Sequence, residues 1–242
     1  MEEFITSGNA LIWTETTGAG PGLLLANGGP GCCDYLGPVA AMVDDVACVT
    51  RFEQRGCGRS SHEEVYTLEQ CLADMEAVRE ARGYDRWAVG GHSWGADIAL
   101  IYALTYPDRV TAVIGIAGGR LVNDRLWSEA YHRNKDERGE FEPEQAYPPN
   151  LEVNRQLNAA ARRYIQRPEL WRDVARLDVP ALFVWGSDDI RPSWPTEQIA
   201  SLMPRARFER IDGAAHVIWH SHAVGLRDLL RAFLSGLDGV GR

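Results

Sequence analysis

A serine at the centre of a short glycine motif is the residue of this chain best suited to covalent chemistry. Ser93 lies in Gly91-His92-Ser93-Trp94-Gly95, a G-x-S-x-G pattern that follows a short apolar run and precedes an apolar helical pattern. Between a strand and a helix, this pattern holds the serine hydroxyl clear of the sheet, at a helix N-terminus that favours developing negative charge. We therefore predict that Ser93 is a nucleophile.

An aspartate and a histidine follow two later strand patterns. A serine hydroxyl becomes a good nucleophile when an imidazole accepts its proton, and a carboxylate orients that imidazole and stabilises its charged form. In a parallel α/β sheet these groups belong in loops at the carboxyl ends of strands. Asp189 and His216 meet this condition, and with Ser93 they give the chain order Ser, Asp, His that is typical of α/β-hydrolases.

Neighbouring residues are alternatives for both roles. Asp188 competes with Asp189 as the acid, and His220 and His222 compete with His216 as the base. The spacing of the three histidines also permits a metal site. Zinc, however, needs several converging ligands with an oriented second shell, and the chain has no H-E-x-x-H motif or suitably spaced cysteine pair. We expect no metal and no organic cofactor.

Composition and charge narrow the classes of function. A chain of 242 residues with 45% hydrophobic and 24% charged residues is typical of a globular protein with one large α/β domain or two small ones. The net charge of −9 argues against a nucleic-acid partner. The acidic N-terminal segment does not resemble a signal peptide, and no apolar run reaches transmembrane length, so we expect a cytoplasmic protein without a membrane partner.

Two residue types carry further information. Without a secretory signal, the five cysteines are expected to be reduced thiols, and Cys33 and Cys57 are weaker candidates than Ser93 for a nucleophile because neither lies in so well formed a turn. Lys135 is the sole lysine among 25 basic residues, which hints at a GC-rich bacterial genome. The sequence specifies no oligomeric state.

Apolar runs alternate with helical patterns along most of the chain. We expect an antiparallel hairpin over residues 3–16, and then strands over residues 22–26, 46–52, 87–90, 110–116, 179–185 and 206–211. We expect helices over residues 35–43 and 68–82, from residue 96 onward, and over residues 195–203 and 221–234. This alternation predicts an α/β fold with a mostly parallel central sheet and helices on both faces.

From residue 118 to 177 the strand signal disappears. Amphipathic helical pieces such as residues 155–165 are separated by proline-containing segments. We therefore predict a core formed by residues 1–117 and 178–242, with residues 118–177 inserted as a short helical cap. Such a cap would lie over the carboxyl edge of the sheet, where a lid excludes water. The acidic stretch at 136–144 is expected to be a solvated loop.

Three motifs taken together resemble those of one family. Asn27-Gly28-Gly29-Pro30-Gly31 is similar to H-G-G-P-G, residues 53–60 (EQRGCGRS) are similar to D-Q-R-G-x-G-x-S, and the motif around Ser93 is similar to G-x-S-W-G. These are motifs of the proline iminopeptidase family within the α/β-hydrolase superfamily. The resemblance implies that Ser93 is the nucleophile, His216 the base and Asp189 the acid. It also implies that the backbone N–H groups of Gly29 and Trp94 form an oxyanion hole.

Some positions depart from the family pattern. Asn27 replaces the histidine of the first motif and Glu53 the aspartate of the second, and we expect both to support loop shape. The cap is shorter than in typical proline iminopeptidases, which bind a free N-terminal ammonium through cap carboxylates. Glu129 and Glu137 are the candidates for that contact here.

The sequence therefore predicts a serine hydrolase that cleaves an amide or ester through an acyl-enzyme. Its most specific form is a proline iminopeptidase-like aminopeptidase acting on a small molecule or short peptide. An esterase or lactonase on the same scaffold is an alternative, because fold and triad do not select the acyl group. A ligand-binding protein and a lyase or cyclase are further alternatives.

Overall fold

The computed structural model describes residues 1–122 and 124–237. Its strands are β1 (Glu2–Ser7), β2 (Ala10–Thr17), β3 (Gly22–Ala26), β4 (Cys48–Phe52), β5 (Trp87–His92), β6 (Val110–Ile116), β7 (Ala181–Gly186) and β8 (Ala206–Ile211). Its helices are α1 (Gly37–Ala40), α2 (Leu68–Ala81), α3 (Trp94–Thr105), α4 (Arg125–Arg138), α5 (Leu151–Tyr164), α6 (Leu170–Arg176), α7 (Trp194–Leu202) and α8 (Ile218–Leu237), with a 3₁₀ turn at Pro107–Arg109.

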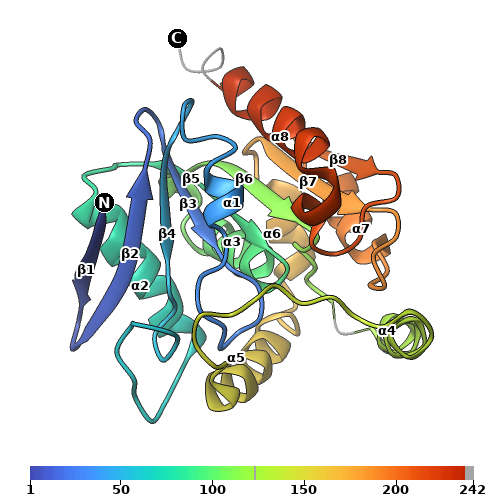
Figure 1. The fold of residues 1–242 in the computed structure, drawn as a ribbon, viewed down its shortest axis with the longest axis horizontal. Coiled ribbons are helices and arrows are strands. Elements are labelled where there is room, and N and C mark those ends of the chain that lie inside the picture. Colours follow the sequence, from blue (N-terminus) through green and yellow to red (C-terminus); the bar gives the residue numbers. More distant parts are fainter. Residues whose placement is uncertain (123, 238–242) are drawn as a thin grey trace.

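A twisted sheet in the order β1-β2-β4-β3-β5-β6-β7-β8 runs through the molecule (Figure 1). The pairs β1–β2 and β2–β4 are antiparallel, and every pairing from β4 to β8 is parallel. Because parallel strands all point the same way, the loops that follow β3, β5, β6 and β7 meet at one edge of the sheet. The predicted mostly parallel sheet is confirmed.

The sheet is covered on both faces because its central strands are apolar on both sides. In β3, Leu24 packs in the core that contains residues of α2, α3 and α7, whereas Leu23 and Leu25 pack in the core that contains residues of α1 and α8. Successive side chains of a strand point to opposite faces, so an unbroken apolar run requires a partner layer on each side. The helices expected on both faces are therefore present.

The helix expected over residues 35–43 is much shorter in the structure. Only Gly37–Ala40 forms α1, with Pro38 in its first turn. Ahead of α1 the Asp34 carboxylate accepts a hydrogen bond from the Leu36 N–H at 3.1 Å, and this local bond competes with helical geometry over residues 34–36. Beyond α1 the chain continues in turns, such as the bond from the Met42 N–H to the Val39 carbonyl at 3.1 Å. A helix is therefore present, but its predicted extent over residues 35–43 is wrong.

Side-chain caps decide where two other helices begin. Thr67 and Gln70 form the predicted capping box at the start of α2. In α5 the Asn150 side chain accepts hydrogen bonds from the N–H groups of Glu152 and Val153, so the helix begins at Leu151, four residues before the predicted start.

The helices α4, α5 and α6 follow β6 and precede β7, and α4 stands apart from the other helices at the lower right of Figure 1. Polar side chains tie this segment to loops at the carboxyl edge of the sheet. The Asn154 amide donates to the Pro30 carbonyl at 2.9 Å, and the Trp127 indole donates to the Pro192 carbonyl at 2.9 Å. The division into core and cap stays a prediction. Residue 123 of the predicted cap and residues 238–242 of the predicted core lie outside the described residues.

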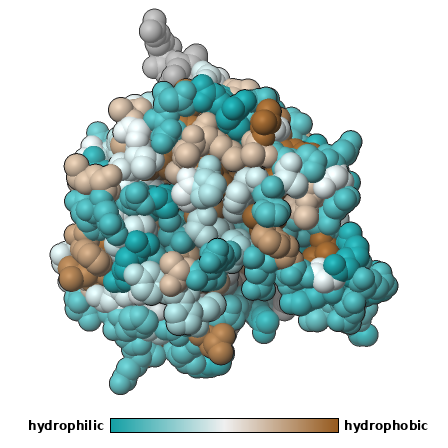
Figure 2. All heavy atoms as spheres, viewed as in Figure 1, coloured by the Kyte–Doolittle hydropathy of each residue, from teal (hydrophilic) through white to brown (hydrophobic). Residues whose placement is uncertain are grey.

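The surface in Figure 2 is mostly hydrophilic, and hydrophobic residues appear on this face as small separate patches. Isolated apolar residues are normal on a protein surface. Within residues 1–122 and 124–237, no helix has both the length and the apolar character required to cross a membrane.

Candidate active site

Ser93 lies in a sharp turn between β5 and α3. Its backbone has φ 54° and ψ −119°, a conformation that costs a non-glycine residue about 1–3 kcal/mol and persists only where the surroundings enforce it. Two glycines allow the close packing that does so. A Cβ on Gly91 would lie 2.3 Å from the Ala26 carbonyl oxygen, and one on Gly95 would lie 1.8 Å from the same atom. The G-x-S-x-G pattern therefore reflects the contact between this turn and β3.

The loop after β3 lies against the Ser93 turn. A Cβ on Gly28 would lie 2.9 Å from the Ser93 Cβ, and Gly29 has φ 66°, which suits glycine. The Asn27 side chain donates to the carbonyls of Gly28 and Cys32, both at 3.0 Å. Among the residues that the structure describes, the N–H groups of Gly29 and Trp94 donate no hydrogen bond. Asn27 thus holds the shape of a loop whose N–H at Gly29 is free.

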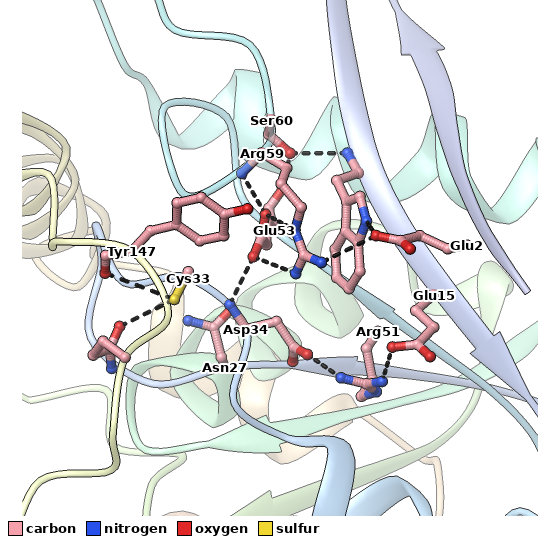
Figure 3. A network of polar contacts seen from close by, with 12 residues as sticks. Glu2, Glu15, Asn27, Cys33, Asp34, Arg51, Glu53, Arg59, Ser60 and Tyr147 are labelled. Atoms are coloured by element: carbon pink, nitrogen blue, oxygen red, sulfur yellow. Dashed lines mark hydrogen bonds and ion pairs between the residues drawn. The ribbon is translucent and has the colours of Figure 1, made fainter.

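Glu53 supports the neighbouring loop (Figure 3). Its carboxylate accepts bonds from the backbone N–H groups of Asp34 and Arg59 at 3.2 and 2.6 Å, and it pairs with the Arg59 guanidinium at 2.7 Å. The Ser60 hydroxyl donates to the Glu53 carbonyl at 2.6 Å. The guanidinium of Arg59 in turn lies 3.3 Å from the centre of the Trp13 ring. Glu53 therefore holds together two loops of the site, as expected from the sequence, and its side chain is fully occupied by these contacts.

Asp189 and His216 form a buried pair on the loops after β7 and β8. His216 Nδ1 lies 2.6 Å from Asp189 Oδ2, and the Arg191 N–H donates to Asp189 Oδ1 at 2.9 Å. Burial lowers the pKa of His216 well below its usual range, and the charges of Arg191 and Arg120 lower it further. Burial raises the pKa of the Asp189 carboxyl to about 7. The low pKa of His216 keeps the imidazole neutral, and at a pH where Asp189 is ionised the imidazole donates to it through Nδ1 and keeps Nε2 as an acceptor.

His92, directly before Ser93, is packed against His216. The two ring centres are 4.5 Å apart, and His92 Nε2 donates to the His216 carbonyl at 3.1 Å. His92 Nδ1 is then an acceptor, and the Tyr35 hydroxyl donates to it at 2.7 Å while accepting from the Gly28 N–H at 2.7 Å. This series of hydrogen bonds joins the loop after β3 to the loop that carries His216. In the described part of the chain no hydrogen bond joins Ser93 to His216, a contact that commonly tightens only when substrate binds.

The rival residues point elsewhere. Asp188 is exposed and accepts a hydrogen bond from the Ser187 hydroxyl at 3.2 Å. His220 stacks on Phe141, with ring centres 4.5 Å apart, and His222 lies 2.8 Å from the Ser221 hydroxyl.

The cysteine alternatives also lack a suitable environment. Cys57 is buried, and burial raises the pKa of its thiol, which disfavours the reactive thiolate. Cys33 is buried beside Gln145 and Tyr147.

A cavity of about 410 Å³ opens beside Ser93. Its lining includes Gly29 and Trp94 from the turns already described, residues of α4 and α5, and three arginines, Arg120, Arg162 and Arg191. A volume of this size suits a small organic ligand. The cavity thus connects the Ser93 turn to the segment between β6 and β7.

The two glutamates predicted to bind a substrate amine do not line this cavity. Glu129 is exposed and pairs with Arg125 at 2.6 Å, and Glu137 is exposed at the end of α4. Glu140, which the sequence did not single out, has a side chain that is only 6% exposed, and it pairs with Arg191 and with Lys135. The structure therefore brings arginines to the cavity where the sequence suggested carboxylates, and no motif in the chain marked them.

Comparison with known proteins agrees with this architecture. A family model described as the alpha/beta hydrolase fold matches residues 21–138. The esterase from Exiguobacterium antarcticum superimposes with a TM-score of 0.79 at 17% identity, covering 97% of this chain and 100% of that one. The protein therefore has the α/β-hydrolase fold.

Within that fold, the chain resembles proline iminopeptidases. It is 35% identical over 144 residues to the proline iminopeptidase of Lactobacillus delbrueckii subsp. bulgaricus. This alignment covers 54% of this chain and 48% of the relative. The proline iminopeptidase structure from Mycobacterium smegmatis covers 100% of both chains with a TM-score of 0.78 at 19% identity. The sequence matches span 34% to 48% of the curated relatives' own length.

Proposed function

We propose that the protein is a serine hydrolase that cleaves an ester or amide through an acyl-enzyme formed on Ser93. The observation that carries the proposal is the buried His216–Asp189 contact of 2.6 Å, packed through His92 against the strained Ser93 turn. A neutral, oriented imidazole packed against His92, the residue that precedes Ser93 at a helix N-terminus, supports the arrangement that serine acyl transfer requires.

Each residue has a defined step in this proposal. The Ser93 Oγ attacks the substrate carbonyl while His216 Nε2 takes the hydroxyl proton, and Asp189 stabilises the resulting imidazolium through Nδ1–H. The N–H groups of Gly29 and Trp94 donate to the oxyanion, and one such donor typically contributes about 3 kcal/mol to transition-state stabilisation. The imidazolium then protonates the leaving group. A water molecule, activated by His216 in the same way, releases the acid and restores Ser93.

The resemblance to proline iminopeptidases supports an aminoacyl amide or short peptide as substrate. An ester or lactone is the second candidate, and the arginines of the cavity favour it because they repel the free ammonium of an aminopeptidase substrate. The cytoplasmic location and bacterial source expected from the sequence stay predictions.

Replacement of the nucleophile tests the proposal. A fluorophosphonate probe, which reacts with activated serine hydroxyls, should label Ser93 in the folded protein, and Ser93→Ala should remove this labelling. The same substitution should lower the rate of hydrolysis of aryl esters or aminoacyl arylamides by at least about 1,000-fold. The exposed Ser235→Ala on α8 serves as the control and should retain both properties. Hydrolysis in ¹⁸O-labelled water should place solvent oxygen in the acid product. Labelling and turnover that survive in Ser93→Ala would refute the mechanism.

A further inference from the structure

The charges that line the cavity beside Ser93 are unevenly balanced. Arg120, Arg162 and Arg191 line it together with only two carboxylates, those of Asp97 and Asp124, among the described residues. A charge that is partly removed from water requires an opposite charge or hydrogen-bond partners. The contacts that these five groups already make therefore indicate which charge a ligand would bring.

Arg120 has unused hydrogen-bonding capacity. It follows β6, and its guanidinium lies 3.6 Å from the centre of the Trp127 ring, with Nε 3.9 Å from Asp97 Oδ2. Within residues 1–122 and 124–237, its side chain donates no hydrogen bond, although a guanidinium carries five N–H donors. Burial lowers its pKa, the charge of Asp97 partly opposes this decrease, and the charge of Arg162 makes a smaller contribution to it. The guanidinium is thus positioned by Trp127 with its donors still available.

The other two arginines add positive charge. Arg191 pairs with Glu140 through Nη2, but its buried Nη1 has no hydrogen-bond partner and lies 3.6 Å from Asp189 Oδ1. Burial lowers the pKa of Arg191 to about 10, and the charge of Arg120 contributes to the decrease. Arg162 is exposed on α5 and forms no ion pair with another described residue. The charge of Arg191 is therefore largely balanced by Glu140 and Asp189, whereas that of Arg162 has no such partner among the described residues, and an anion in the cavity would reduce the repulsion between Arg120 and these two arginines.

The two cavity carboxylates are already occupied. Asp97 Oδ1 accepts from the N–H groups of Gly119 and Arg120, both at 2.8 Å, and burial raises the pKa of this carboxyl to about 6. Asp124 caps α4 by accepting from the Leu126 N–H at 2.8 Å, and it also accepts from the Trp194 indole at 3.4 Å. A substrate ammonium would therefore find no unengaged carboxylate among these residues and would meet three guanidinium groups.

We propose that this cavity binds the carboxylate of an acidic ester or lactone substrate, with Arg120 as its principal partner and Arg191 and Arg162 adding positive charge. The proposal rests on the proposed function of Ser93. A guanidinium matches the two oxygens of a carboxylate in a bidentate pair, which supplies orientation as well as affinity. Arg120 then determines specificity by fixing the position of the substrate's ester bond in the cavity shared with Ser93.

Substrates matched in size and different in charge test the proposal. The first pair is 4-nitrophenyl hydrogen adipate and 4-nitrophenyl hexanoate, in which the charge lies on the acyl side. The second pair is 4-acetoxybenzoate and its methyl ester, in which the charge lies on the leaving group. At constant ionic strength, we expect kcat/KM to favour the anionic member of at least one pair by about 10-fold to 100-fold.

Variants assign the preference to its residue. Arg120→Gln should reduce the anionic-to-neutral ratio of kcat/KM to near one, and Arg162→Gln should reduce it by a smaller factor. Arg125→Gln removes the same charge from the cap at a side chain that is 89% exposed and outside the cavity lining, so it should leave the ratio unchanged. A ratio near or below one in both pairs, or a ratio that Arg120→Gln leaves intact, would overturn the proposal while Ser93-dependent turnover still supports the hydrolase.

A binding measurement separates the two proposals if no ester is hydrolysed. Calorimetry with adipate should then detect binding that Arg120→Gln weakens about 10-fold and that Arg125→Gln preserves. With no turnover of any ester, absence of Arg120-dependent adipate binding would overturn the carboxylate site, whereas fluorophosphonate labelling of Ser93 and hydrolysis of aminoacyl arylamides decide the hydrolase separately.

Discussion

Asp189→Asn is the most discriminating change to the proposed triad, because the adjacent Asp188 offers a matched control. The two side chains are consecutive in the chain, but Asp189 is 6% exposed and contacts His216, whereas Asp188 is exposed and accepts from the Ser187 hydroxyl. Asp189→Asn and Asp188→Asn therefore remove the same side-chain charge, but only Asp189→Asn changes the group that contacts the His216 imidazole.

The structure indicates how the new amide would orient. The Arg191 N–H donates to Asp189 Oδ1 at 2.9 Å, so an asparagine would keep its oxygen on that side and turn its NH₂ toward His216 Nδ1. The imidazole must then accept through Nδ1 and carry its proton on Nε2, where it cannot take a proton from Ser93. A triad held in the wrong tautomer loses activity by about 10,000-fold.

The assay is kcat/KM for an aryl ester at pH 8, together with urea unfolding followed by circular dichroism. Burial raises the pKa of Asp189, so its ionised form is disfavoured by the fold, and loss of this charge should not reduce stability at pH 8. Asp188→Asn should retain kcat/KM within about twofold, since an exposed side chain contributes little. Equal losses in both variants, or an active Asp189→Asn, would show that Asp189 does not orient His216.

Two further predictions follow from the turn and from the buried pair. Gly95→Ala places a Cβ 1.8 Å from the Ala26 carbonyl oxygen, so we expect about 1–3 kcal/mol of destabilisation and about a 100-fold loss of kcat/KM. The control is Gly225→Ala in α8, whose Cβ would lie 3.8 Å from Ile211 and should stabilise the protein by about 0.5–1 kcal/mol. Urea titration and ester kinetics measure both variants, and a Gly95→Ala protein as stable and active as the parent would contradict the close packing. Burial lowers the pKa of His216 and raises that of Asp189 to about 7, so the pair takes up its first proton no higher than about pH 7. The value of kcat/KM should therefore be constant above that pH and fall below it. A midpoint above pH 8 in the pH–rate profile would instead indicate an imidazole stabilised in its charged form.

Features encoded by short stretches of sequence were predicted well. The capping box of Thr67 and Gln70 begins α2 as expected, because both partners lie within one helical turn. The turn at Ser93 follows from two glycines whose absent side chains leave room for β3. The helix expected over residues 35–43 is shorter than the apolar periodicity predicted, because the Asp34 side chain bonds to the Leu36 N–H ahead of α1 and the chain after Ala40 continues in turns.

The amino-acid sequence by itself determined the α/β architecture, the Ser93 turn and the strand ends on which Asp189 and His216 lie, since these depend on local backbone preferences and apolar patterning. The family resemblance already implied Asp189 as the acid, and the tertiary structure brings its carboxylate to His216 while Asp188 is exposed. Only the tertiary structure decided that Arg120 and Arg191 rather than Glu129 and Glu137 line the cavity. These outcomes depend on side-chain directions set by contacts between segments far apart in the chain. Trp127 against Arg120 and Glu140 against Arg191 are such contacts, and no spacing within the sequence records them.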